Sequence, residues 1–235
     1  VRTMPKDHIV GLQASPTSVT QVTIAAGQCR DVNDTFDIVL SAADTADITV
    51  AEDRDFTEAA GTWYYVHVIA DSTGARPTRG FLSTRPGAQG DGAPPILPGG
   101  YDKFRRVGAV RNDSGSNFLL ARTIGGGQLR RVQFTDNPVV VTSAVQTVEQ
   151  TVTLIIPPTS TLAVIYASLT GIAVAQDLRI YRDSVSIVCM GISGIDIYEQ
   201  SFDIETNASQ QVKWVNANAN ACTNTISMRG YYDAL

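Results

Sequence analysis

The sequence predicts an all-β protein of two β-rich domains, the second a β-sandwich with a jelly roll as one of its arrangements. Short segments alternate apolar and polar residues with a period of two, which is the pattern of half-buried strands. Clusters of Gly, Pro, Asn and Asp separate these segments at intervals of roughly 8–12 residues, as in sandwiches. No segment keeps a helical period for more than two turns. The 235 residues suffice for one large domain or for two smaller ones.

The clearest strand of the first domain is Trp63–Ala70. Its two faces are both largely apolar, so we expect a central strand that is covered on both sides. The residues before it predict three shorter strands by alternation: Val19–Ala26, Phe36–Leu40 and Asp47–Ala51.

A turn signal at Asp71–Gly74 ends the central strand, and the prolines and glycines of Arg76–Gly100 predict a segment that is mostly loop. Beyond it, Phe104–Arg111 and Asn117–Arg122 flank the turn residues Asn112–Gly115 and read as a hairpin. Glycines interrupt the pattern at Gly125–Gly127, and a strand resumes at Leu129–Phe134.

The composition changes around Thr135–Pro138, where charged residues thin out and Thr, Val, Ile and Asn become frequent. We therefore expect domains at residues 1–136 and 137–235. The run Leu162–Ala175 has the length of a buried helix, but its β-branched residues and Gly171 favour a strand. The strands predicted in this domain are Val148–Ile156, Leu162–Ala175, Leu178–Arg182, Ser184–Met190, Tyr198–Ile204, Gln211–Val215 and Thr223–Met228.

Catalytic signals are weak, and we expect that the chain is not an enzyme. The two histidines are His8, in the N-terminal segment, and His67, which lies mid-strand where a packed role is commoner than a catalytic one. No serine has the G-x-S-x-G context of a nucleophile elbow. The carboxylate pairs Asp53 with Asp55 and Asp196 with Glu199 are typical of solvated turns rather than of a glycosidase site.

No cofactor or metal is expected. Asp31, Asp34 and Asp37 form a loose acidic loop, but it lacks the ligand spacing and closing Glu of an EF-hand. Gly125–Gly127 lacks the Lys of a phosphate-binding loop. The three cysteines, Cys29, Cys189 and Cys222, have no metal-ligand spacing and read as reduced, small apolar residues; Cys189 with Cys222 is the one pairing worth testing.

Two groups of residues are candidate binding sites. The basic group reads either as a docking surface for an acidic neighbour or as charged strand edges that prevent sheet-to-sheet pairing; it comprises Lys103, Arg105, Arg106, Arg111 and Arg122, with Arg130 and Arg131 beyond. The aromatic residues near the end can stack on sugar rings or fill the core; they are Trp214, Tyr231 and Tyr232.

Charge excludes several partners. The net charge is −5, and residues 1–136 hold 14 of the 18 basic and 15 of the 23 acidic residues. A general binder of nucleic acid or of anionic membranes is therefore not expected.

The longest apolar run is too short and too polar to insert into a bilayer. Residues Val1–Pro5 contain no apolar segment of a signal peptide.

The order of phrases across residues 9–134 resembles that of tailed-bacteriophage virion proteins of the fibre, spike and appendage type. The phrases are DHIVGL, VTIAAGQCRD, DVNDTFDI, GTWYYVHVIAD, LPGGYDKFRRVGAV and RRVQF. The insertion ARPTRGFLSTRPGAQGDGAPPI departs from the pattern. The last part, with IYRDSVS, SQQVKWVNANANACTNTISM and GYYD, is similar to C-terminal β-domains of such proteins.

The resemblance implies a structural protein of the virion, a homotrimeric fibre, spike or appendage subunit that contacts other virion proteins. In this reading the extended arm Val1–Ser15 anchors the first domain to a neighbouring virion subunit by strand addition or by loop docking. The second domain presents loops outward, either to a host-surface glycan or as a stabilising cover. The alternatives are a capsid-surface decoration protein and a secreted carbohydrate-binding module; a phage depolymerase or esterase is disfavoured by the scarcity of histidine. The resemblance transfers no catalytic residue.

Overall fold

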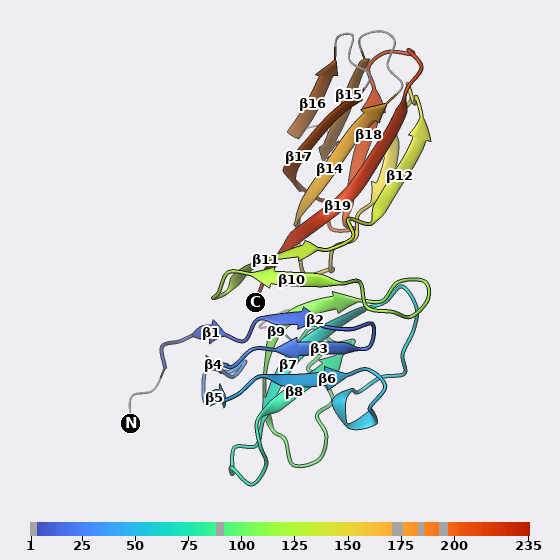
Figure 1. The fold of residues 1–235 in the computed structure, drawn as a ribbon. Coiled ribbons are helices and arrows are strands. Elements are labelled where there is room, and N and C mark those ends of the chain that lie inside the picture. The colour runs from blue at the N-terminus through green and yellow to red at the C-terminus, as the bar shows by residue number, and fades with distance from the viewer. Residues whose placement is uncertain (1–3, 88–91, 171–175, 183–185, 193–196) are drawn as a thin grey trace. The chain divides into compact units, whose positions relative to one another are not determined.

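The computed structural model describes residues 4–87, 92–170, 176–182, 186–192 and 197–235, and Figure 1 shows its course. The expected all-β class is confirmed, because the described residues contain strands, turns and one short 3₁₀ helix but no α-helix. The chain divides into two compact units. Unit 1 contains Val1–Thr135 together with Asp233–Leu235, and unit 2 contains Asp136–Tyr232. No helix in the described part of the chain is long and apolar enough to cross a bilayer.

Unit 1 consists of three small antiparallel sheets and one hairpin. The sheets have the strand orders β1-β4-β5, β2-β3-β6 and β8-β7-β9, and β10 pairs with β11. The elements are β1 (Ile9–Gly11), β2 (Ala14–Pro16), β3 (Gln21–Ile24), β4 (Gly27–Arg30), β5 (Asp37–Leu40), β6 (Asp44–Asp47), η1 (Ala51–Asp53), β7 (Trp63–Ala70), β8 (Arg79–Ser83), β9 (Lys103–Arg111), β10 (Ala121–Ile124) and β11 (Leu129–Phe134).

Strand β7 has the predicted bounds and the predicted burial on both faces. Tyr64, Val66 and Val68 belong to the main core, which they share with buried residues of β3 and β5. The opposite face, represented by His67 and Ile69, is fully buried as well. The apolar character of both faces therefore predicted the central strand of this unit correctly.

Strand β8 and the third predicted strand of unit 1 differ from the sequence prediction. Strand β8 lies within the segment predicted as mostly loop, and Phe81 and Leu82 in it are buried. Gly80 packs so closely that a Cβ there would lie 2.6 Å from Ile24 Cδ1. The third predicted strand is displaced to β6, because the Asp47 carboxylate accepts the backbone N–H of Thr49 at 2.9 Å and turns the chain into η1.

The segment Val1–Ser15 is not the predicted extended arm over its described residues. Strand β1 pairs with β4, and β2 pairs with β3. Ile9 and Leu12 are buried in the core of unit 1. The apolar residues of this segment therefore complete the core of their own unit, which is the physical reason for the difference.

The predicted hairpin of Phe104–Arg111 with Asn117–Arg122 is confirmed only next to its turn. An antiparallel bridge joins Asn112 to Phe118, and backbone N–H groups donate from Asp113 to Asn117 O and from Leu119 to Arg111 O, both at 2.8 Å. Along the rest of its length β9 pairs with β7. Phe118 is buried edge-on against Tyr64, with ring centroids 6.4 Å apart. The chain leaves the sheet after this contact, and β10 starts at Ala121 to pair with β11.

Unit 2 is an eight-stranded β-sandwich with the connectivity of a jelly roll (Figure 1). In one sheet β12, β19, β14 and β17 are successive neighbours, and β19 is also hydrogen-bonded to β11 of unit 1, which makes this sheet six-stranded with β10. The other sheet has the order β13-β18-β15-β16. The strand pairs β12–β19, β13–β18, β14–β17 and β15–β16 are antiparallel, so the chain forms one long ribbon rolled into two sheets. The strands are β12 (Val139–Ala144), β13 (Gln150–Thr153), β14 (Leu162–Thr170), β15 (Gln176–Arg182), β16 (Ser186–Ile192), β17 (Ile197–Glu205), β18 (Gln211–Asn216) and β19 (Thr223–Ala234).

The strand that was predicted at Leu162–Ala175 is β14 as far as Thr170, and residues 171–175 lie outside the described residues. Strand β12 was not predicted, because its alternation is weak and its residues are half-buried or exposed. The inner face of β14, Ala163, Ile165, Ala167 and Leu169, is fully buried. This strand therefore supplies much of the sandwich core.

Candidate functional site

Three arginines are buried in the described part of unit 1, and the guanidinium of one of them, Arg130, donates hydrogen bonds to backbone carbonyls. Arg130 on β11 is 1% exposed. Its guanidinium donates to Leu12 O at 2.6 Å, to Gly11 O at 2.7 Å, to Val107 O at 3.0 Å and to Gly127 O at 3.1 Å. Burial lowers the pKa of Arg130 to about 10, which still leaves it charged at neutral pH. Arg130 therefore joins the N-terminal segment to β9 and β11.

The other two arginines, Arg105 and Arg106 on β9, hold residues 233–235. Arg106 is 2% exposed, and its Nη2 lies 3.6 Å from Asp233 Oδ1 and donates to Ala234 O. Arg105 donates to Leu235 O at 3.4 Å and lies 3.7 Å from the Asp7 carboxylate. We call Arg105, Arg106 and Gln128 the tail seat, and Asp233–Leu235 the tail; Gln128 O accepts the backbone N–H of Leu235 at 2.8 Å.

The five predicted interface residues therefore do not form one surface. Arg105 and Arg106 are buried inside unit 1, because they neutralise Asp7 and Asp233 and bind the tail. Lys103 lies 3.7 Å from its neighbour Asp102. Arg111 is half-buried and donates to Gly61 O at 3.4 Å. Lys103 and Arg111 stand at opposite ends of β9, so neither extends the other into a patch.

Arg122 is exposed on β10 and is not beside Arg111, because β10 pairs with β11. Its guanidinium donates to Gln133 Oε1 at 3.2 Å. These two residues line a pocket of about 280 Å³ together with Phe134 and Thr135. Of the predicted basic group, Arg122 on β10 and Arg131 on β11 are the exposed members.

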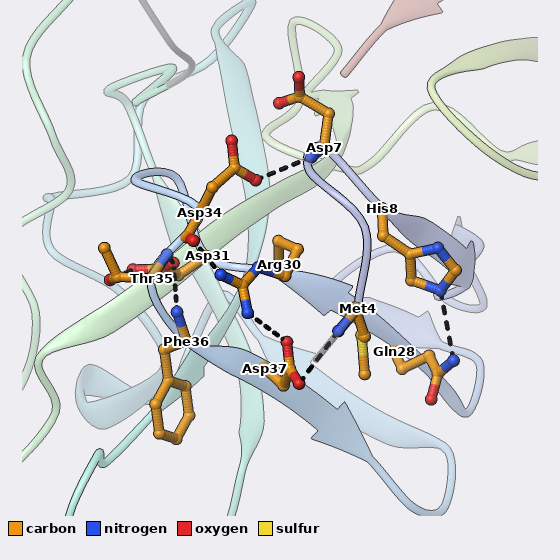
Figure 2. A network of polar contacts seen from close by, with 10 residues as sticks. All are labelled: Met4, Asp7, His8, Gln28, Arg30, Asp31, Asp34, Thr35, Phe36 and Asp37. Carbon is orange, nitrogen blue, oxygen red and sulfur yellow. Dashed lines mark hydrogen bonds and ion pairs between the residues drawn. The ribbon is translucent and has the colours of Figure 1, made fainter. Parts of the chain in front are cut away.

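The acidic loop of unit 1 is occupied by internal hydrogen bonds, as Figure 2 shows. Asp31 is 1% exposed, and its Oδ1 accepts the backbone N–H of Thr35 at 2.6 Å and of Phe36 at 2.8 Å. Asp34 accepts the backbone N–H of Asp7 at 2.8 Å. These carboxylates therefore shape the loop rather than facing a common point.

The third carboxylate of this loop, Asp37, is paired with Arg30 at 2.6 Å (Figure 2). This hydrogen bond is the main cause that lowers the pKa of Asp37. Within the described residues, no group of three or more His, Cys, Asp or Glu side chains is arranged to hold a metal ion.

The candidate carboxylate pair Asp53 and Asp55 is structural. Asp53 is 6% exposed, forms an ion pair with Arg79 and accepts the N–H of Asp47 at 2.8 Å. Asp55 Oδ2 accepts Ser83 Oγ at 2.8 Å and the N–H of Ile96 at 2.7 Å. Asp196 of the other pair lies outside the described residues, and Glu199 is exposed on β17.

His67 is fully buried, and its Nε2 donates to Arg85 O at 3.1 Å. Desolvation lowers the pKa of His67 to about 3, with Arg106 contributing in the same direction. A neutral, enclosed imidazole of this kind matches the packed role expected from the sequence.

The cysteines that the structure describes are free and buried. Burial raises the pKa of the Cys29 thiol to about 12, which makes it a poor nucleophile at neutral pH. Cys222 is free and 8% exposed, and Gln176 Nε2 lies 3.7 Å from its sulfur. The side chain of Cys189 lies outside the described residues, so its proposed pairing with Cys222 gains no support.

Two of the three candidate glycan-stacking residues are core residues of unit 2. Trp214 is 3% exposed and Tyr231 is 1% exposed, so neither presents a ring to a ligand. Trp214 pairs with Gln150 and Ile180 in the centre of its sheet. Tyr232 is half-buried, and its hydroxyl donates to Asp203 Oδ2 at 3.2 Å.

A more accessible tyrosine that the sequence did not single out is Tyr166 on β14. The guanidinium carbon of Arg229 lies 4.7 Å from its ring centroid, and a hydrogen bond to Glu199 is the main cause that raises the pKa of Tyr166. Tyr232 pairs with Leu162, so Tyr166 and Tyr232 lie on one face of the sheet β12-β19-β14-β17, four residues apart along β14. The sequence signal was alternation along β14, which places residues 162, 164, 166 and 168 on the side opposite the core.

The comparisons identify no family for the chain. No protein-family model matches it, and no curated protein matches it. Among solved structures, the crystal structure of a Bacillus thuringiensis Cry1Da tryptic core variant is similar at 7% identity and a TM-score of 0.24, over 97% of this chain. The chain spans 53% of the length of that structure, and a TM-score this low supports no argument about fold or function.

Proposed function

We propose that this chain is a structural protein of a tailed-bacteriophage virion, a fibre, spike or appendage subunit that assembles with copies of itself and with other virion proteins. The observation that carries the proposal is the jelly-roll connectivity of unit 2. Viral coat domains and lectin domains repeatedly use this fold, although a fold alone does not define a function. The resemblance across residues 9–134 adds the phage-specific part.

The chemistry of the described residues is consistent with this role. The acidic clusters and the buried histidine of unit 1 are engaged in internal contacts that stabilise loops and strands. Charged residues make up 17% of the chain, below the usual share of about 25%. A surface with few charges suits a protein that covers part of itself with neighbours.

Two measurements test the proposal. Light scattering coupled to size exclusion is expected to give a homotrimer of the 25.1 kDa chain. Antibodies raised against the recombinant chain are expected to label purified phage particles from the source of the gene in immunogold microscopy. A stable monomer together with unlabelled particles would overturn the proposal.

Carbohydrate binding is a second candidate function, favoured by the tyrosines on the outer sheet face of unit 2. Tyr166 and Tyr232 are half-buried and have carboxylate partners at Glu199 and Asp203, a mixture of apolar and hydrogen-bonding groups that suits sugars. A glycan array probed with the whole chain tests this function. Binding that Tyr166→Ala removes and Tyr181→Ala preserves would support it, because Tyr181 lies on the other sheet.

A further inference from the structure

The tail binds the tail seat through arginine contacts and backbone hydrogen bonds. Every copy of the chain carries both the seat and the tail. Arg106 binds the carbonyl of Ala234 and the carboxylate of Asp233, and Arg105 binds the carbonyl of Leu235. A further hydrogen bond joins two backbones, from Leu235 N–H to Gln128 O at 2.8 Å, and β19 is a hydrogen-bonded neighbour of β11. The Leu235 side chain packs against the core cluster of unit 1. The tail therefore binds as a short added strand, and the ion pair of Asp233 with Arg106 holds it in place.

An unfilled tail seat is costly for unit 1. The side chains of Arg106 and Asp233 are 2% and 1% exposed, so the removal of one leaves a buried charge without its partner. Arg106 also has two further buried nitrogens, Nε and Nη1, with no hydrogen-bond partner. Every tail seat in an assembly is therefore expected to be filled by some tail.

The tail reaches the seat on a strand that otherwise belongs to another unit. Residues 223–232 of β19 lie in unit 2 and pair with β12 and β14, and only residues 233–235 belong to unit 1. The tail is thus a short ligand carried by a separately packed unit. Its contacts are the same whether it comes from its own chain or from a second copy, which is the condition for exchange between protomers.

We propose that the tail seat is the site through which copies of this chain are linked, unit 1 of one copy binding residues 233–235 of another. This inference rests on the proposed function, because a particle that holds copies side by side raises the effective concentration of neighbouring tails. Exchange of tails between copies then joins the subunits, and it uses the same contacts that the tail and the seat form within one chain.

A charge-exchanged pair of variants tests the link. Arg106→Asp has an acidic seat and a native tail, whereas Asp233→Arg has a native seat and a basic tail. Each variant alone repels its own tail, but in a mixture each seat matches the tail of the other chain. Native mass spectrometry is expected to show complexes containing both variants at least tenfold more abundant than self-complexes of either. The matched control is Lys103→Asp mixed with Asp233→Arg, because Lys103 lies on the same strand and forms its ion pair with Asp102.

Disulfide trapping provides a second readout that does not depend on altered charges. Gln128→Cys in one chain and Leu235→Cys in another bring thiols to the hydrogen-bonded positions of seat and tail. A disulfide-linked dimer in the oxidised mixture supports exchange. If the mixture stays monomeric while the chain carrying both substitutions closes its own disulfide, the exchange is wrong.

The outcomes separate this inference from the proposed function. Labelled particles without any exchanged disulfide would overturn the exchange alone. Exchanged dimers from a chain that is absent from particles would overturn the virion role while leaving the link between copies in place.

Discussion

Asn216 and Asn224 hydrogen-bond to each other in both directions, from Asn216 Nδ2 to Asn224 Oδ1 at 2.9 Å and from Asn224 Nδ2 to Asn216 Oδ1 at 3.0 Å. Both side chains are buried, at 2% and 0% exposure. Asn216 Oδ1 also accepts the N–H of Gln146 at 2.8 Å, and Asn224 donates to Ala144 O at 3.1 Å. The pair therefore ties β18 and β19 to the connection between β12 and β13.

Asn224→Ala is expected to lower the free energy of unfolding of unit 2 by about 3 kcal/mol, because several buried polar groups lose their partners together. Chemical denaturation in a Trp63→Phe background, followed by the fluorescence of Trp214 in the core of unit 2, measures the change. The matched control is Asn218→Ala, since Asn218 is exposed and uses its backbone carbonyl to bind Gln176. Equal stability of the two variants would contradict the structural role of the pair.

Gly27→Ala is expected to destabilise unit 1 by about 3 kcal/mol, because a Cβ there meets rigid backbone. It would lie 2.6 Å from Leu12 N and 2.9 Å from Gly11 Cα, so β1 would have to separate from β4. Thermal unfolding of the variant measures the loss. At Gly99, where a Cβ has no neighbour within 4 Å, the same substitution is expected to change stability by no more than about 0.5 kcal/mol.

His67 is expected to make unit 1 less stable as the pH falls below 6.5. The pKa of His67 is about 3 in the folded state and near its ordinary value of 6.5 when unfolded, so the unfolded chain binds the extra proton between these values. At pH 5 the free energy of unfolding is lower by about 2 kcal/mol from this group, and above pH 6.5 the effect disappears. Denaturation between pH 7 and pH 5 measures the slope.

His67→Gln is expected to remove most of that slope, whereas His8→Gln is expected to keep it. An unchanged slope in His67→Gln would show that other groups cause the pH dependence.

The thiols of Cys29 and Cys222 are expected to resist alkylation in the folded chain, because both are buried and burial raises the pKa of both. In a Cys189→Ser variant, iodoacetamide at pH 8 is expected to modify less than about a tenth of these thiols until denaturant is added. Rapid modification of the native variant, followed by mass spectrometry, would show that one of these sites opens.

The sequence predicted most strands because alternation along a strand directly reflects burial on one face, as at β7 and β11. It missed β8 because the arginine and glycine in that strand broke the pattern, although Gly80 is required there by close packing against Ile24. It expected Arg105 and Arg106 to be accessible because arginine usually lies at the surface. Their carboxylate partners, Asp7 and Asp233, are far away in the sequence, and only the tertiary fold brings them near.

Because the last three residues complete unit 1, this unit cannot finish folding on the ribosome before residue 235 has been synthesised. Unit 2 contains all its strand partners by residue 232 and can close first, although the gene encodes it second. In the nascent chain, unit 1 therefore remains incompletely folded while the jelly roll is translated. During this time Arg106 lacks its ion-pair partner Asp233. Chaperones that bind nascent chains are therefore expected to bind the N-terminal half of the chain until residue 235 has been synthesised.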